Sequence, residues 1–203
     1  MRSRLAGFAA TIALALLLSG CAPIDSIFPL YKDEDAVFDD HLLGTWQPVI
    51  TDVNASDKDQ RWIFSHVEGD QFYDFKWTAV GAKGGFIAKA RFVRLGNNVF
   101  IDFEGDTQKL DWAPNSGNVV PYPMITTHMI GRVWLENDSL LIHFLSDDWV
   151  KEQVKAGTFS LAHLDVNGSQ ILTAQTDDLR KFMQAHADDT KALSEEFKFT
   201  RAK

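Results

Sequence analysis

The sequence predicts a mainly β domain over residues 41–203, an antiparallel meander of about 8–10 strands that closes into a barrel and carries two short helices. Apolar and polar residues alternate with a period of two along most of this region, which is typical of half-buried strands. Turn-forming pairs such as Asn137-Asp138 and Asn167-Gly168 separate the alternating runs. A sheet of so many antiparallel strands with one apolar face loses its open edges by closing into a barrel.

Composition excludes several classes of protein. The chain has 203 residues, of which 45% are hydrophobic and 24% charged, proportions that are ordinary for a globular domain. Its 28 Asp and Glu outnumber 20 Lys and Arg, for a net charge of −8, which argues against nucleic-acid binding. The single cysteine excludes an intrachain disulfide and a multi-cysteine metal site.

Residues 1–20 have the features of a secretory signal peptide. Two basic residues, Arg2 and Arg4, begin the segment. The apolar stretch that follows, from Leu5 to Leu18, is shorter than the roughly 20 residues of a membrane-spanning helix. A membrane-anchor helix is the alternative interpretation.

The segment Leu18-Ser19-Gly20-Cys21 resembles the lipobox of bacterial lipoproteins, in which a leucine and two small residues precede a cysteine. The resemblance implies cleavage before Cys21, transfer of a diacylglyceryl group to its sulfur, and acylation of the new amino terminus. Several acyl chains give stable anchoring, whereas one chain alone is marginal. Ala22 stands where an aspartate tends to retain Gram-negative lipoproteins in the inner membrane. The resemblance therefore implies a lipid-anchored envelope protein in the outer membrane, facing the periplasm.

Residues 21–40 are predicted to comprise the acylated cysteine and a flexible tether. Pro23 and Pro29 interrupt regular structure. Five carboxylates between positions 33 and 40 add negative charge, a composition typical of a solvated spacer. We interpret this charge as a solvated face and not as a metal site.

Ten strands are predicted in the domain that follows, near residues 42–50, 60–67, 71–79, 85–95, 98–104, 125–135, 139–146, 159–165, 169–174 and 195–201. A two-residue turn at Gly69-Asp70 pairs Trp62 with Trp77. A turn through residues 81–84 then pairs Trp77 with Ala88. Both hairpins place their apolar residues on one common face, and a slip of one residue would invert that pattern.

The next two hairpins follow the same logic. A turn at Gly96-Asn97-Asn98 pairs Ala90 with Phe103 on the apolar face and Arg91 with Asp102 on the opposite face. Opposite charges across from each other are expected on a face that is exposed to water. The turn at Asn137-Asp138 continues the meander in the same way.

Two helices interrupt the later strands. Ser146 or Asp147 can cap a helix over residues 147–156, and Gly157 ends it. Thr176 can cap a second helix over residues 177–186. Its apolar stripe, which we expect to pack on the barrel, consists of Leu179, Phe182, Met183 and His186.

The segment His41-Leu42-Leu43-Gly44-Thr45-Trp46 is similar to the Gly-X-Trp kernel that opens the first strand of lipocalins and related calycins. A late helix followed by a short final strand also resembles the lipocalin ending. The resemblance implies a calycin-like barrel in which Trp46 plugs one end against a basic side chain from the last strands. Arg201 is the candidate for that side chain. No Thr-Asp-Tyr motif follows, so the resemblance concerns the fold.

The inward face predicts an apolar ligand pocket. Ala88 and Ala90 are small and leave room beside Phe75 and Phe103. The expected lining residues are Phe64, His66, Tyr73, Phe75, Trp77, Ala88, Ala90 and Phe92. His66 and Tyr73 are expected to form a polar end near the mouth. In the alternative interpretation the aromatic side chains fill the barrel completely.

The sequence predicts no catalytic residue, no metal site and no cofactor. The inward face carries no carboxylate, so paired acid and base groups are absent from it. Neither a His-Glu-X-X-His motif nor a Gly-X-Ser-X-Gly motif is present. Residues 52–56 resemble the start of a calcium loop but lack its later glycine and glutamate, so we interpret them as an acidic hairpin loop.

Two functions remain open. The first is a noncatalytic outer-membrane lipoprotein whose barrel binds a small apolar or amphiphilic ligand. The alternative is a structural or interaction lipoprotein of the envelope with a filled barrel and a protein partner, in which Trp112, Trp134 and Trp149 contribute to the interface. The expected partners are the membrane, through acyl chains on Cys21, and a small hydrophobic ligand. No nucleic acid is expected, and the pattern does not identify a protein partner.

Overall fold

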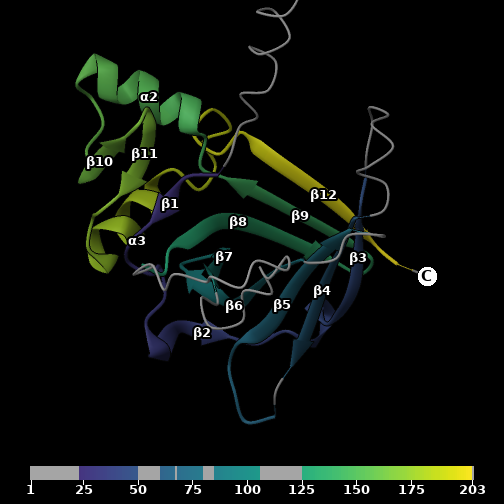
Figure 1. The fold of residues 1–203 in the computed structure, drawn as a ribbon. Helices are drawn as coiled ribbons and strands as arrows, with labels where there is room; N and C mark the ends of the chain where they lie inside the picture. The colour runs from purple at the N-terminus through teal and green to yellow at the C-terminus, as the bar shows by residue number, and fades with distance from the viewer. Residues whose placement is uncertain (1–22, 50–59, 67, 80–84, 106–124, 203) are drawn as a thin grey trace, which may run out of the picture.

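A computed structural model describes residues 23–49, 60–66, 68–79, 85–105 and 125–202. Eight antiparallel strands in this part of the chain form a closed barrel, which confirms the predicted fold class (Figure 1). In chain order they are β3 (Gly44–Pro48), β4 (Gln60–His66), β5 (Tyr73–Ala79), β6 (Gly85–Leu95), β7 (Asn98–Gly105), β8 (His128–Glu136), β9 (Ser139–Phe144) and β12 (Glu195–Arg201). The last strand, β12, pairs with both β9 and β3 and thereby closes the ring.

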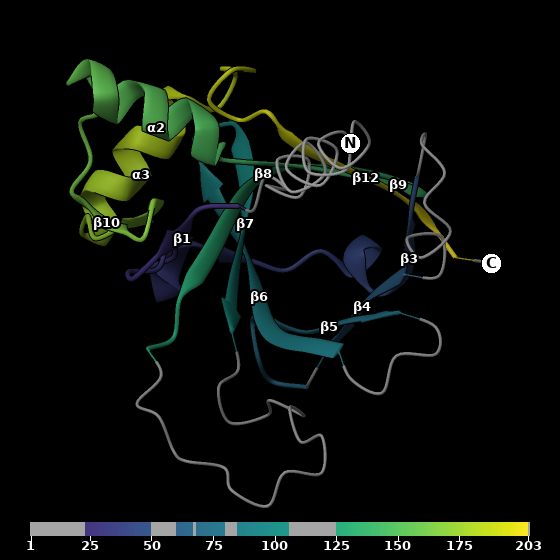
Figure 2. The same cartoon turned by 45° about the horizontal axis from the view of Figure 1, so that its top comes forward.

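The other elements are not part of the ring of strands. Ahead of it come β1 (Asp25–Ser26), the 3-10 helix η1 (Asp33–Asp35), β2 (Ala36–Val37) and the 3-10 helix η2 (Asp40–Leu42). Between β9 and β12 come α2 (Asp147–Ala156), β10 (His163–Val166), β11 (Ser169–Leu172) and α3 (Thr176–Ala185). Strand β1 pairs antiparallel with β8 and parallel with β11, so the β10–β11 hairpin extends the sheet away from the ring. Figure 2 shows α2, α3 and this hairpin together on one side of the barrel.

Turn chemistry sets most of the strand register. Asn137 and Asn167 have φ of 46° and 55°, the left-handed backbone that tight hairpin turns require and asparagine tolerates. The predicted pairs Trp62 with Trp77 and Arg91 with Asp102 are confirmed.

The β5–β6 hairpin differs from the prediction by two residues. Trp77 pairs with Phe86, where the sequence had indicated Ala88. A turn through residues 81–84 would place Val80 opposite Gly85, whereas Thr78 pairs with Gly85. A shift of two residues preserves the face on which every side chain lies, because the side-chain period of a strand is two. The apolar face therefore survives the error.

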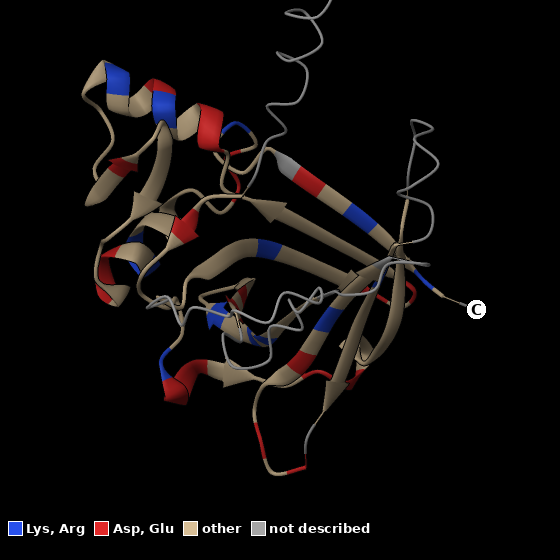
Figure 3. Ribbon diagram, in the orientation of Figure 1, with Lys and Arg blue, Asp and Glu red and all other residues tan. Residues whose placement is uncertain are grey.

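The helix ends follow capping rules, with one correction. The Ser146 hydroxyl accepts a hydrogen bond from the Trp149 backbone N–H, and Gly157 adopts the left-handed conformation with φ of 70°. The first turns of α2 and α3 carry acidic residues, as helix dipoles favour (Figure 3). Thr176 is not the cap of α3, because it is the first helical residue and its hydroxyl donates to the Pro29 carbonyl at 2.8 Å.

The domain has two hydrophobic cores. The first lies inside the barrel and includes Trp46, Phe64, Tyr73 and Phe103. The second lies between the outer face of strands β6 to β8 and the layer formed by α2, α3 and β11, with Val93 and Phe100 supplied by the barrel. Leu179, Phe182 and Met183 of the predicted α3 stripe are buried there. This part of the outer barrel face is therefore dry and not exposed to water.

Residues 23–40 are not a flexible tether. Ile24 and Leu30 are buried in the second core, with 6% and 0% of their surface exposed. The Leu30 backbone N–H donates to the Asp102 carboxylate at 2.6 Å, and Asp35 forms an ion pair with Arg180 at 2.8 Å. The prediction was wrong because it rested on the prolines and carboxylates of the segment, whereas its apolar residues are buried by partners distant in the sequence. We name residues 23–37 the N-terminal strap.

Candidate functional site

An apolar cavity of about 410 Å³ lies within one end of the barrel. It is lined by Pro23, Pro48, Gln60, Trp62, Phe75, Trp77, Phe86, Phe103, Met129, Phe144, Phe197 and Phe199. Every strand of the ring contributes to this lining, and Pro23 of the N-terminal strap completes it. Among the lining residues that the structure describes, Gln60 alone has a polar side chain apart from the indole N–H groups, so the cavity suits an alkyl chain or another apolar group.

Trp62 forms the inner wall of the cavity. Its ring lies 4.4 Å from that of Phe199, 5.0 Å from that of Phe75 and 5.6 Å from that of Phe103, measured between centroids. Trp77 and Phe197 are each 36% exposed, so they stand at the mouth of the cavity. Aromatic side chains therefore line the cavity from its inner wall to its mouth.

The other end of the barrel is closed. Trp46 is completely buried, and its indole N–H donates to the Leu42 carbonyl at 2.8 Å. The Arg201 guanidinium lies over the Trp46 ring at 4.4 Å from its centroid and donates to the carbonyls of His41 and Leu43 at 2.5 and 2.7 Å. It also reaches Asp138 at 3.1 Å. The structure thus places together the tryptophan and the arginine that the Gly-X-Trp resemblance had implied.

Tyr73 contributes to this closed end and not to a polar mouth. Its hydroxyl accepts a hydrogen bond from the Asp39 N–H at 2.7 Å and donates to the Asp39 carbonyl at 3.2 Å. Its ring stacks on Phe38 at a centroid distance of 4.8 Å. Burial raises the pKa of Tyr73 from its ordinary value of 10.0 to about 12. The tyrosine therefore fastens residues 38 and 39 across the barrel end.

The cavity differs from the predicted pocket in most of its lining. Of the eight predicted residues, Phe75 and Trp77 line it. Phe64, Tyr73, Ala88, Ala90 and Phe92 lie in the packed part of the barrel core, each no more than 2% exposed.

His66 is exposed, and its ring lies 4.2 Å from that of Phe38. Alternation along the strands identified the inward face correctly, but it could not show how deep each residue lies along the barrel axis. The lining residues that β8, β9 and β12 supply were missed for that reason.

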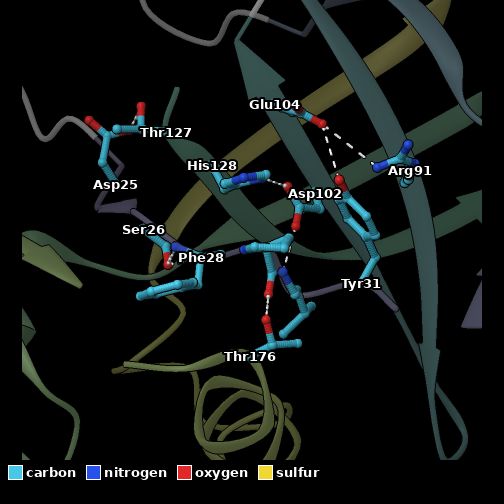
Figure 4. Close-up of polar contacts among 12 residues, drawn as sticks. Asp25, Ser26, Phe28, Tyr31, Arg91, Asp102, Glu104, Thr127, His128 and Thr176 are labelled. Atoms are coloured by element: carbon cyan, nitrogen blue, oxygen red, sulfur yellow. Dashed lines mark hydrogen bonds and ion pairs between the residues drawn. The ribbon is translucent and has the colours of Figure 1, made fainter. Parts of the chain in front are cut away.

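A buried polar cluster fastens the N-terminal strap to the outer barrel wall (Figure 4). The Asp102 carboxylate, 1% exposed, lies 2.8 Å from His128 Nδ1 and accepts the Leu30 N–H. The Tyr31 hydroxyl donates to Glu104 at 3.2 Å, and the Arg91 guanidinium lies 3.8 Å from the centroid of the Tyr31 ring. The Asp102–His128 contact joins β7 to β8, and the other contacts join the strap to β6 or β7, so we assign the cluster a structural role.

Arg132 and His143, which pair on the neighbouring strands β8 and β9, also have protein partners. The Arg132 guanidinium lies 4.7 Å from the centroid of the Trp134 ring, and burial lowers the pKa of Arg132. His143 contacts the Leu193 carbonyl at 3.0 Å and Glu196 at 3.1 Å. Among the described residues, no group of three or more His, Cys, Asp or Glu side chains is arranged to hold a metal ion. The calcium-like segment 52–56 lies outside the described residues.

Comparison with known proteins adds no relative. No protein-family model matches the chain, and neither a curated protein nor a solved structure matches it. Within the described ranges, no helix has the length and apolar character that crossing a membrane requires.

Proposed function

We propose that this protein is a noncatalytic, outer-membrane-anchored lipoprotein whose barrel binds a small apolar or amphiphilic ligand in its end cavity. The observation that carries the proposal is the cavity itself. Its volume of about 410 Å³ falls in the range of ligand pockets, and its lining is almost entirely apolar. The other half of the barrel is packed with side chains, so the cavity is confined to one end.

The lining favours a ligand with an alkyl chain and a polar group at the mouth. Burying a methylene contributes about 0.8 kcal/mol, and micromolar affinity corresponds to about 8 kcal/mol. About ten buried methylenes therefore supply micromolar affinity before the cost of ordering the chain is subtracted. A ligand with a charged group along its length would leave that group without partners, which disfavours binding.

The direct test is to express residues 22–203 in the cytosol, purify them without detergent, and titrate them with a fluorescent fatty acid. Mass spectrometry of the purified protein identifies any ligand that it retains from the cell. Phe197→Asp places a carboxylate at the mouth and is expected to weaken binding at least about tenfold. Leu164→Asp is the matched control, because Leu164 is 55% exposed on β10, outside the barrel. Wild-type protein that takes up no alkyl chain would refute the proposal.

Membrane attachment rests on the lipobox resemblance. Cys21→Ser is expected to release the protein from membranes or to leave its signal peptide uncleaved. Fractionation and gel mobility measure both results. A variant that fractionates and migrates as the wild type does would show that Cys21 is not the anchor.

A protein partner is the second candidate, and strand β10 favours it. This strand ends the sheet, so one of its edges is unpaired in the described structure. Leu164 and Val166 on the same strand are 55% and 45% exposed. Edge strands with exposed apolar side chains can bind an added strand from a partner. Crosslinking in cells from position 164, with position 152 on α2 as the control, tests whether a partner covers this edge.

A further inference from the structure

We propose that the mouth of the cavity faces the membrane that holds Cys21, and that the cavity takes the alkyl chain of a membrane lipid directly from that surface. This inference rests on the proposed function and specifies its ligand class. The ligand expected is a single-chain amphiphile, such as a lysophospholipid, whose head group stays at the mouth.

The first observation is the place where the described chain begins. Pro23 lines the cavity. The next residues are fixed to the barrel, because Asp25 pairs with Met129 of β8 and Ser26 pairs with His128. Met129 is itself a lining residue. Cys21 is two residues before Pro23, so an extended chain places it no more than about 7 Å away. An anchor at Cys21 therefore holds this end of the barrel at the membrane surface.

The second observation is the character of the rim. Among the described residues, six large apolar side chains are exposed, and four of them belong to segments at the cavity end: Val49, Trp77, Ile125 and Phe197. Trp77 and Phe197 line the cavity, Val49 follows the lining residue Pro48, and Ile125 shortly precedes β8. Aromatic and apolar side chains of this kind are favoured at a membrane interface.

The opposite end has a different surface. Arg201, Asp138 and His41 lie there, and the Arg201 guanidinium is held by backbone carbonyls and by Asp138. The Asp39 carboxylate accepts the His41 N–H at 2.9 Å. Among the described residues, the closed end is therefore polar and the rim of the cavity is apolar, which matches one orientation on a membrane.

This arrangement has a kinetic consequence. A lipid that crosses water must expose its chain before it reaches a binding site. A cavity whose mouth rests on the membrane receives the chain without that step. Moving the mouth away from the membrane should therefore slow uptake from vesicles and leave the equilibrium occupancy of the cavity unchanged.

The experiment uses the acylated full-length protein in vesicles of phosphatidylethanolamine and phosphatidylglycerol. The probe is a lysophosphatidylcholine whose chain carries bromine near its methyl end, which quenches Trp62 and Trp77 when the chain enters the cavity. The key variant carries a Gly-Ser spacer of roughly twelve residues between Ala22 and Pro23, which extends the anchor to about 20 Å. We expect the spacer to slow quenching about tenfold, with the same final extent.

Matched substitutions locate the quenching. Trp77→Phe is expected to reduce the quenched fraction, because Trp77 lines the cavity. Trp149→Phe is the control, since Trp149 packs against Phe159 and Phe182 in the second core. Equal loss of quenching in the two variants would overturn the inference.

The outcomes separate this inference from the proposed function. Equal rates with and without the spacer, at full final quenching, overturn the inference and leave ligand binding intact. If neither the acylated wild type nor the spacer variant is quenched, and residues 22–203 are not quenched either, the proposed function itself is refuted. If the brominated lipid quenches residues 22–203 but not the acylated protein, an acyl chain on Cys21 occupies the cavity of the acylated protein. This result also overturns the inference.

Discussion

Replacing Tyr73 by phenylalanine should change the pH dependence of stability in a defined way. The hydroxyl makes two hydrogen bonds with the Asp39 backbone at the closed barrel end. At pH 7 their loss is expected to cost about 1–2 kcal/mol. The ring itself is retained in Tyr73→Phe, so its packing on Phe38 and Phe92 is unchanged.

The pH dependence follows from the raised pKa. The folded protein keeps Tyr73 protonated to about pH 12, whereas the unfolded chain releases this proton near pH 10.0. Below pH 10 the stabilisation from the Tyr73 hydroxyl is complete. It is lost as the pH rises from 10.0 to about 12. By pH 11 the loss amounts to about 1.4 kcal/mol, so the wild type should lose nearly all its advantage over Tyr73→Phe.

Urea unfolding of both proteins at pH 7 and pH 11, followed by tryptophan fluorescence, measures this change. The quantity of interest is the difference in the free energy of unfolding between the two proteins, since the titration of all other groups cancels in it. A difference that stays constant between the two pH values would refute the assigned burial of the Tyr73 hydroxyl.

Three further substitutions test other parts of the structure by the same unfolding measurement. Arg201→Ala is expected to cost about 2–3 kcal/mol, because it removes the cation over Trp46 and the hydrogen bonds to two carbonyls, and Arg201→Lys should restore only part of this. Leu30→Ala is expected to cost about 2–5 kcal/mol, whereas Leu164→Ala, at an exposed position, should have little effect. Ala90→Trp is expected to destabilise the barrel by about 1–3 kcal/mol or more through overpacking, since Ala90 is fully buried away from the cavity. Wild-type stability in any of the three would contradict the packing described for that residue.

The strand meander could be predicted because its information is local. Turn residues fixed the ends of the hairpins, and a period of two fixed which face was apolar, so even the shifted β5–β6 pairing kept Phe75 and Trp77 inside. The depth of a residue along the barrel axis depends on strand tilt and on partners far away in the chain. That is why Tyr73, expected at a ligand mouth, lies at the closed end.

The α3 stripe was predicted to pack on the barrel, but the contribution of the outer barrel face to this second core was missed although the sequence carries a signal for it. Along β6 and β7, apolar residues occupy both faces, as in Phe92-Val93 and in Val99-Phe100-Ile101. Such runs are typical of strands that are buried on both sides. The paired charges of Arg91 and Asp102 obscured this, because they suggested a face exposed to water. Asp102 is instead buried by the strap, whose carboxylates and prolines suggested a solvated spacer although five of the eight residues 24–31 are large and apolar.

The pairing of β12 with β3 has a consequence for the order of folding. Arg201 pairs with Trp46, so the ring joins residues separated by most of the domain. Contacts between such distant residues slow folding, because a long loop must close before they contribute. Until the seven residues of β12 have left the ribosome, the preceding strands form an open sheet with unpaired edges at β3 and β9. A chain truncated before β12 is therefore expected to aggregate through those edges and not to form a smaller barrel.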